Sequence, residues 1–181
     1  MHEELSAEEL HRLAAAYAKC WLAHDGCWFL AVEEGHGLQE AICQRHSSLR
    51  SVRQDERSWA RFAPLEARRG MGARGITPGG GLEALAEALR FRMYSFLNEQ
   101  RLDFEEGRLR FTMTECRVQA ARRRKGLPHN PRFFPCKPVG TTEFSRFAEA
   151  VDPRISTRCL FCPPDEPPDG GFCSWGFRVE K

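Results

Sequence analysis

Apolar residues in the first half of the chain recur at helical spacing. Ser6 and Glu9 have the spacing of a capping box, which satisfies free amide groups where a helix begins. One stripe then recurs at steps of three and four residues and comprises Leu10, Leu13, Tyr17, Trp21, His24, Trp28 and Ala31. Gly35 and Gly37 predict the end of this helix. Further helices are predicted at residues 38–43, 48–69 and 82–89.

Alternating patterns in the second half of the chain predict strands. Residues 92–98 alternate between two faces, which favours a strand, although a continued helix fits the same residues. A turn at 105–107 separates two alternating apolar segments and predicts a β-hairpin. A second hairpin is predicted from strands at 154–162 and 173–180, which a loop rich in Pro, Asp and Gly connects.

Two short helices are predicted between the hairpins, at 117–126 and 140–153, with Thr141 as the N-cap of the second. In the order β-β-α-α-β-β, two hairpins can join into one antiparallel sheet with helices on one face, which is an α+β fold. We expect an N-terminal helical region, 1–90, and a cysteine-rich α+β region, 91–181, within one compact domain.

Composition and charge exclude several classes of protein. The 181 residues are 41% hydrophobic and 29% charged, which is typical of globular proteins. The net charge of +2 gives no overall field that would favour nucleic acid or an anionic membrane, and no apolar run approaches the roughly 18 residues of a membrane span. The acidic start MHEELSAEEL is unlike a secretory signal. We therefore expect a cytoplasmic protein, in a compartment where structural disulfides are rare.

Five of the eight cysteines lie at predicted element ends in the second half: Cys116, Cys136, Cys159, Cys162 and Cys173. Because the ends of adjacent strands and helices meet at one rim of a sheet, these thiols can converge. Cys159-x-x-Cys162 has the spacing with which two thiolates hold one metal ion, and zinc prefers four such ligands. The sequence therefore predicts a metal site of Cys136, Cys159, Cys162 and Cys173, for zinc or for iron, which the same thiolates accept.

Other interpretations of these cysteines stay open. They can be buried thiols that pack as small hydrophobic groups, or a disulfide or redox pair. Pro163 and Pro164 argue against a thioredoxin-type pair, because that pair opens a helix. In the first half, Cys20, His24 and Cys27 share one helical face, and their aromatic neighbours favour core packing over metal binding.

Two polar positions interrupt apolar stripes and are candidates for ligand binding. They are His24, with Asp25 beside it, and Glu66. A charged carboxylate alone among apolar neighbours costs several kcal/mol, so Glu66 needs a partner such as His24 or Arg92. These four residues predict a ligand pocket between helices and sheet, and the alternative is a purely structural pair.

Several segments resemble an uncharacterised bacterial and archaeal family of unknown function: "WLAHDGCWFLAVEE", "FAPLEARRG", "FTMTECRVQAARRRKGLP", "FPCKPVGTTEFSRFAEAVDPRI", "RCLFCPPD" and "CSWGF". More distantly, "MTEC", the Cys136 segment and Cys173-x-x-x-Phe177 are similar to the L-2-amino-thiazoline-4-carboxylate hydrolase family, which opens a thiazoline ring by adding water. The same cysteines are similar to vinyl-reductase-like ligand-sensing domains, in which late cysteines hold a zinc. The Cys159/Cys162 pair departs from the hydrolase pattern.

This resemblance implies two functional hypotheses. In the first, a metal or Cys116, as nucleophile or additional ligand, assists hydrolysis at a C–N bond of a small heterocyclic or amide-like substrate. In the second, zinc is structural and the protein binds or senses a small molecule without catalysis. Both hypotheses expect a small-molecule partner, no nucleic acid and no membrane, and they leave homo-oligomerisation open.

Overall fold

The computed structural model describes residues 6–43, 52–125, 136–167 and 171–180. In these ranges the elements are α1 (Ala7–Cys43), α2 (Val52–Arg74), α3 (Gly81–Arg90), the 3-10 helix η1 (Met93–Phe96), β1 (Glu99–Glu105), β2 (Arg108–Glu115), α4 (Arg117–Lys125), α5 (Lys137–Val151), β3 (Ile155–Phe161) and β4 (Cys173–Val179). The predicted α+β class is confirmed. None of the helices in these ranges combines the length and apolar character needed to cross a membrane.

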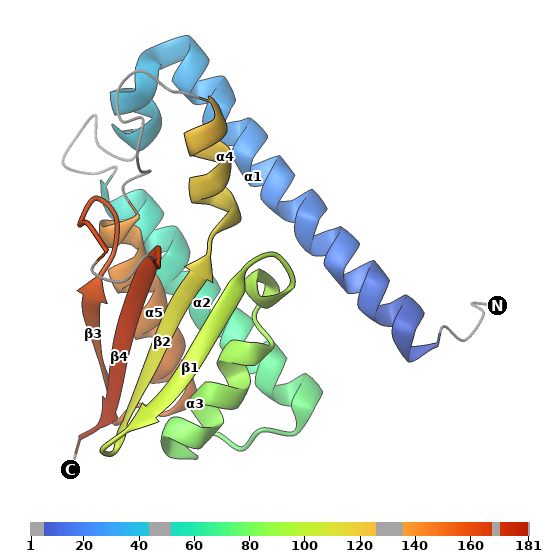
Figure 1. The fold of residues 1–181 in the computed structure, drawn as a ribbon, viewed down its shortest axis with the longest axis vertical. Helices are drawn as coiled ribbons and strands as arrows, with labels where there is room; N and C mark the ends of the chain where they lie inside the picture. The colour runs from blue at the N-terminus through green and yellow to red at the C-terminus, as the bar shows by residue number, and fades with distance from the viewer. Residues whose placement is uncertain (1–5, 44–51, 126–135, 168–170, 181) are drawn as a thin grey trace.

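The four strands form one antiparallel sheet in the order β1-β2-β4-β3, so the two predicted hairpins join through β2 and β4. Phe111 pairs with Trp175 and Leu109 with Phe177, which places four large buried side chains on one face of the sheet. α3 and α5 contact the sheet and α2 packs on α5, with α5 and α2 behind the sheet in Figure 1. The core therefore lies between this face and the helices.

α1 begins at the predicted capping box, in which Ser6 N–H donates to Glu9 Oε2 at 2.9 Å and Glu9 N–H donates to Ser6 Oγ at 3.3 Å. Gly37, with a φ of 83°, interrupts the helix where a break is predicted, and helical backbone continues to Cys43. Both helical segments that the sequence predicts here are therefore confirmed.

α1 packs on the molecule through only part of its predicted stripe, since Leu10, Leu13, Tyr17 and His24 are exposed. Ala18 is buried instead, and the Trp21 ring stacks on Phe62 with ring centroids 5.8 Å apart. The sequence favoured core packing for three residues of α1, and this prediction is wrong because all three are exposed: Cys20, His24 and Cys27. Successive residues turn by about 100° around a helix, so a stripe can be apolar without being the face that the fold buries.

Residues 92–98 do not form the predicted strand. Arg92 precedes η1, Ser95 Oγ donates to the Arg92 carbonyl at 2.7 Å, and the Met93 N–H donates to Glu66 Oε1 at 3.2 Å. These bonds to a neighbouring helix and within the turn replace the ladder bonds of a strand, and β1 begins only at Glu99.

Two helix boundaries also differ from the predictions. α5 begins at Lys137 rather than near Thr141, because Pro138 suits the first helical turn. Thr141 is no N-cap, since its Oγ1 donates to the Lys137 carbonyl at 2.8 Å inside the helix. α2 continues past residue 69 and ends before Gly75, whose φ is 67°. Its predicted start at 48–51 lies outside the described residues.

Candidate thiol-lined functional site

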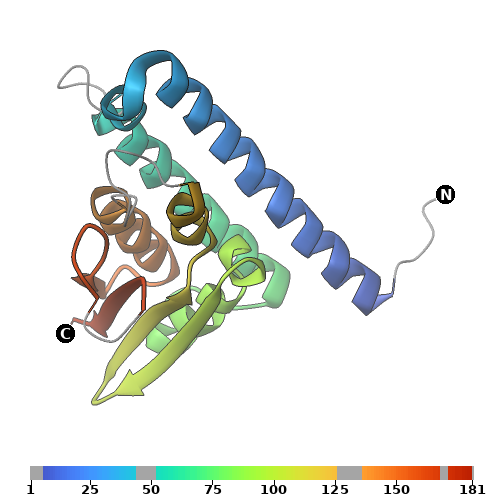
Figure 2. The ribbon, with the colours of Figure 1, turned by 45° about the horizontal axis from the view of Figure 1, so that its top comes forward.

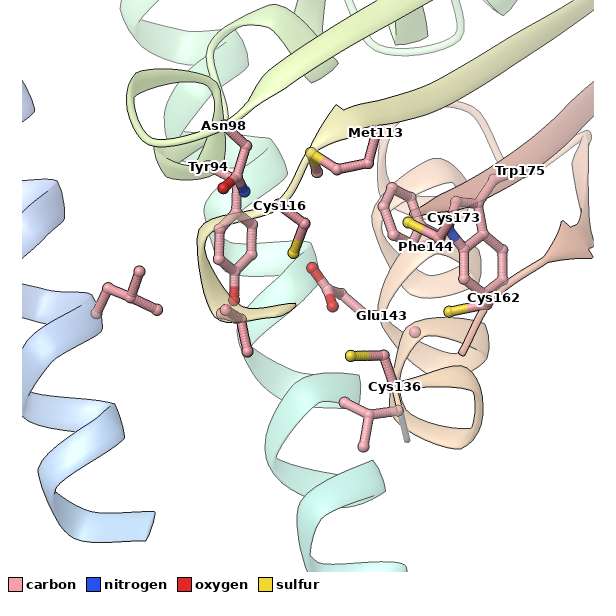
Figure 3. Close-up of a pocket in the computed structure, with 14 residues that line it drawn as sticks. Tyr94, Asn98, Met113, Cys116, Cys136, Glu143, Phe144, Cys162, Cys173 and Trp175 are labelled. Atoms are coloured by element: carbon pink, nitrogen blue, oxygen red, sulfur yellow. The ribbon is translucent and has the colours of Figure 1, made fainter. Parts of the chain in front are cut away.

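A cavity of about 150 Å³ lies where α4 and α5 begin, beside the adjoining ends of β2 and β4 (Figure 3). We call it the thiol cavity, after the four cysteines that line it: Cys116, Cys136, Cys162 and Cys173. Glu143 also lines it, and Figure 3 shows its carboxylate among the cysteine side chains. Most of the remaining lining is apolar and includes Leu22 of α1, Val118, Val139 and Phe144.

Each of the four cysteines lies at the end of an element. Cys116 directly precedes α4, Cys136 is the N-cap residue of α5, Cys162 follows β3 and Cys173 begins β4. Because these ends meet at one rim of the sheet, thiols that are up to 57 residues apart in the sequence share one space. The predicted convergence of thiols is therefore observed for these four cysteines.

A β-bulge turns Cys162 of the Cys159-x-x-Cys162 segment toward the cavity side of the sheet. Residues three apart in a regular strand point to opposite faces of the sheet. Here Cys159 pairs with Trp175 and Phe161 with Ser174, so the ladder skips Leu160. This shift brings Cys162 beside Cys173, to whose sulfur it donates a hydrogen bond. Cys159 is partly exposed and does not line the cavity.

Gln119 in the first turn of α4 connects two of the thiols. Its side chain is buried, and its Nε2 donates to Cys136 Sγ at 3.1 Å. Its backbone N–H and that of Val118 both donate to the Cys116 sulfur. N–H donors favour the negatively charged form of sulfur, so Gln119 supports a thiolate at both cysteines. The sequence analysis missed this residue, although its position three residues after Cys116 at a predicted helix start was a usable signal.

Cys173 is the cavity thiol with the strongest tendency to ionise. The hydrogen bond from the Cys162 thiol lowers the pKa of Cys173, and the Trp175 indole and the Met113 N–H act in the same direction, against the effect of burial. Trp175 Nε1 is buried and makes no hydrogen bond of regular geometry among the described residues. It is therefore placed to donate to a Cys173 thiolate.

The other three cavity thiols hold their protons more tightly than usual. Burial is the main factor that raises the pKa of Cys116 to about 11, and it also raises the pKa of Cys136, where Cys116 and Cys173 add to the effect. The pKa of Cys162 is raised because its thiol donates to Cys173 and because it is buried. Without a cation, these three thiols are neutral at pH 7.

A buried ion-pair chain holds Glu143 at the cavity. Arg92 is only 3% exposed, pairs with the Glu143 carboxylate, and donates to Glu66 Oε2 from Nε at 3.0 Å and from Nη2 at 2.8 Å. Burial alone would lower the pKa of Arg92, but the two carboxylates outweigh it and raise that pKa. Arg92 is therefore charged. The expected partnership of Glu66 with Arg92 is confirmed.

The sequence analysis missed Glu143, although the rule that singled out Glu66 applies to it. Glu143 lies on the α5 stripe that also carries Gly140, Phe144 and Phe147, all of which are buried. A carboxylate on such a stripe needs a partner, and Arg92 is that partner.

The remaining predicted ligand-binding residues do not join this group. His24 is exposed on α1 and does not line the cavity, although Leu22 of the same helix does. The side chains of Asp25 and Trp28 lie outside the described residues. Glu66 lies behind the cavity, where it contacts Arg92 rather than the cavity itself.

As placed, the thiols do not form a closed metal shell. Among the described residues, no three His, Cys, Asp or Glu side chains are arranged so that they could hold one metal ion. The four thiols line a common space, and a bound ion would require them to turn toward one another.

Comparison with known proteins identifies the family. A family model described as a family of unknown function (DUF6125) matches residues 3–179. The chain belongs to this family. No curated protein and no solved structure is significantly similar to the chain. The expected membership of an uncharacterised family is confirmed, and the distant similarity to thiazoline hydrolases stays a prediction.

Proposed function

We propose that this DUF6125 protein binds a thiophilic metal ion, with zinc as the best candidate, through Cys116, Cys136, Cys162 and Cys173. The observation that carries this proposal is that thiols from four separate element ends enter one cavity. Four thiolates are a preferred shell of structural zinc, and iron accepts the same ligands. In this ligand set Cys116 replaces the sequence-predicted Cys159, because Cys116 lines the cavity and Cys159 does not.

The hydrogen bonds around the sulfurs support a charged form of these cysteines. Metal-bound ligands depend on outer groups that orient them and tune their basicity. Gln119 donates to Cys136 and to Cys116, and Trp175 Nε1, which makes no hydrogen bond of regular geometry among the described residues, lies near Cys173. A buried N–H without an acceptor costs free energy, and a Cys173 thiolate would supply that acceptor.

The raised thiol pKa values also favour a cation. Burial disfavours an isolated thiolate, and neighbouring cysteines raise the pKa of Cys136 further because their negative charges would repel one another. A divalent cation reverses this repulsion. We therefore expect binding to release protons from the thiols.

We further propose that a small, mostly apolar molecule occupies the space beside the thiols. Leu22, Val118, Val139 and Phe144 supply apolar walls, and Glu143 supplies one fixed carboxylate. Hydrolysis of a small cyclic substrate requires an open ligand position, which arises if Cys116 leaves the metal shell and acts beside the Glu143 carboxylate. The alternative is a binding or sensing domain in which all four thiols hold the ion and no ligand position stays open.

Metal analysis of cysteine variants tests the proposal. The wild-type protein, purified under reducing conditions, should contain one zinc or iron per chain. Cys116→Ser, Cys136→Ser, Cys162→Ser and Cys173→Ser should each lose most of it, whereas the matched control Cys159→Ser should retain it. If Cys116→Ser retains its metal while the other three cavity variants lose theirs, the result would favour the catalytic role of Cys116. Equal metal content in all five variants would contradict the proposed site.

A further inference from the structure

Two of the cavity thiols, Cys162 and Cys173, lie opposite each other at one end of the sheet. β3 and β4 pair in antiparallel register, with Phe161 facing Ser174. The next step of this register sets Cys162 against Cys173, and the Cys162 thiol donates a hydrogen bond to the Cys173 sulfur. The two sulfurs are therefore in contact in the thiol cavity, although ten residues separate the cysteines in the sequence.

The spacing of this pair suits a disulfide. Directly opposed residues of an antiparallel pair have Cα atoms about 4.5–5.5 Å apart, and a disulfide joins Cα atoms about 4.4–6.8 Å apart. Hydrogen bonds hold both backbones in place. The Asp165 N–H donates to the Cys162 carbonyl at 3.0 Å, and next to Cys173 the Phe172 N–H donates to the Met113 carbonyl at 2.8 Å. A bond between the two sulfurs can therefore form without rebuilding this end of the sheet.

Cys159 is a poorer partner for Cys162. Between these two cysteines, three residues of the bulged strand lie against two of β4. Two extended residues span about 7 Å and three span about 10 Å, so the Cα separation exceeds the ordinary reach of a disulfide. Cys159 also lies outside the cavity. The fold therefore favours Cys173 over the neighbour in sequence.

The cavity gives a small oxidant access to the pair. Both cysteines line a space of about 150 Å³, whereas one water molecule needs only about 10–15 Å³ of such space. Cys173 is partly exposed, while Cys162 is only 1% exposed. A hydroperoxide in the cavity therefore reaches Cys173 more easily than Cys162.

We propose that Cys162 and Cys173 are a reversible oxidation site, at which a hydroperoxide converts the two thiols to a disulfide. The Cys173 sulfur attacks one peroxide oxygen, so an S–O bond forms, the O–O bond breaks, and the thiol proton leaves on the released oxygen as water or an alcohol. The Cys162 sulfur then attacks the Cys173 sulfur. The S–S bond forms, the S–O bond breaks, and the sulfenic hydroxyl leaves as water with the Cys162 proton. The two thiols lose two electrons to the peroxide, and a dithiol reductant restores them by exchange.

Oxidation of the pair also dismantles the metal site. This consequence rests on the proposed function, because Cys162 and Cys173 are two of the four proposed ligands. Metals bind the thiolate, and two sulfurs joined in a disulfide no longer supply it. The remaining two thiols cannot complete the four-ligand shell that structural zinc prefers. A bound ion in turn holds both sulfurs and should slow their oxidation.

Disulfide mapping of the reduced, metal-free wild-type protein tests the pair. After treatment with hydrogen peroxide and alkylation of the remaining thiols, cleavage after arginine and before aspartate separates Cys162 from Cys173 but leaves Cys159 and Cys162 in one peptide. We expect a Cys162–Cys173 cross-link at least about tenfold more abundant than any other, and its loss on treatment with dithiothreitol. A Cys159–Cys162 disulfide as the main product, or no disulfide within the chain, would overturn the proposal.

Single variants provide the matched controls and test the order of the two steps. Cys159→Ser should keep the cross-link, whereas Cys162→Ser should lose it and accumulate a Cys173 sulfenic acid that dimedone labels. Circular dichroism checks that both variants keep their fold. Dimedone labelling of Cys162 in Cys173→Ser, with no labelling of Cys173 in Cys162→Ser, would overturn the assigned order.

Zinc release distinguishes this inference from the proposed function. Zinc-loaded wild-type protein should release about one zinc ion per disulfide formed, and dithiothreitol should restore binding. A protein that holds zinc but forms no Cys162–Cys173 disulfide when metal-free would refute the oxidation site and leave the proposed function standing. A protein that forms this disulfide but binds no metal when reduced would refute the proposed function and leave the oxidation site standing.

Discussion

At the scale of single residues, Arg92 connects two helices to the thiol cavity. It contacts Glu66 of α2 and Glu143 of α5, and its guanidinium lies over the ring of Phe147, 4.8 Å from the centroid. Each of these charges would be costly to bury alone, and together they satisfy one another. Arg92 thereby fixes the position of the carboxylate that faces the four thiols.

Arg92→Met should lower the free energy of unfolding by about 3–5 kcal/mol, because it leaves buried carboxylates without their cation. Urea denaturation monitored by tryptophan fluorescence measures this loss. Arg90→Met is the matched control: Arg90 is exposed and pairs with Glu87 on the surface, so its loss should cost at most about 1 kcal/mol. Equal effects of the two substitutions would contradict the structural role of Arg92.

Substitution of Gln119 tests whether its N–H donors stabilise the thiolate form of the cavity cysteines. Gln119→Leu preserves the size of a buried side chain and removes the N–H donor to Cys136, so zinc affinity should fall by about 10–100-fold. Competition with a chromophoric chelator measures the affinity. Arg124→Leu, on the exposed side of the same helix, should leave it unchanged. An unaltered affinity in Gln119→Leu would show that this amide does not support metal binding.

At the scale of elements, the close approach of α5 to β4 shapes the cavity. A Cβ atom added at Gly140 would lie 2.8 Å from Trp175 Cζ2, so only glycine lets the helix come this near. The Trp175 ring also stacks on Phe144, with centroids 4.7 Å apart and planes 19° apart. This packing places Cys136, at the start of α5, beside Cys173, at the start of β4.

Gly140→Ala should therefore destabilise the protein by about 1–3 kcal/mol, since the indole must shift. Gly72→Ala, in α2, has no atom within 4 Å of the new Cβ and should stabilise the protein by about 0.4–1 kcal/mol. Thermal unfolding compares the two. The smaller ring in Gly140→Ala/Trp175→Phe should make the combined cost less than additive, and strict additivity would mean that the two residues do not clash.

The elements also show what the sequence could predict. Periodicity located the helices and both hairpins, since local spacing follows from burial on one face. It could not show which face of α1 the fold buries, because Ala18 and the predicted apolar stripe are both compatible with a helix. It favoured a strand over a continued helix at residues 92–98, where Met93–Phe96 form a 3-10 helix, and the contacts of Arg92 and Met93 with Glu66 of α2 leave no local signal. The bulge at Leu160, which turns Cys162 toward the cavity side of the sheet, depends on pairing with β4 and leaves no local signal.

At the scale of the whole molecule, the fold collects element ends at one rim and buries the thiols there. The sequence was sufficient to expect this convergence, because each cysteine sits at a predicted boundary. Glu143 and Gln119 carried sequence signals that were missed, but the pairing of Glu143 with Arg92 was not predictable, since that contact joins two distant elements. Burial in this common space raises the thiol pKa values and so links metal binding to pH.

Zinc affinity should rise with pH. Cys116, with a pKa raised to about 11, and Cys136 carry protons at neutral pH that a metal must displace. Each displaced proton makes binding tighter by about tenfold per pH unit, so the dissociation constant should fall at least tenfold between pH 6.5 and 7.5. The ordinary thiol pKa lies well above this range, so the direction holds for every neutral cavity thiol. A zinc dissociation constant that does not change between pH 6.5 and 7.5 would contradict binding that displaces protons from the cavity thiols.

The most direct test of the central claim is cysteine alkylation mapped by mass spectrometry, with and without one equivalent of zinc. Cys20 and Cys27 are exposed and serve as internal controls whose rates should not change. Zinc should slow the alkylation of Cys116, Cys136, Cys162 and Cys173 together, each by at least about tenfold, because alkylation requires release of the ion. Unchanged rates at these four cysteines would contradict a shared metal site in the thiol cavity.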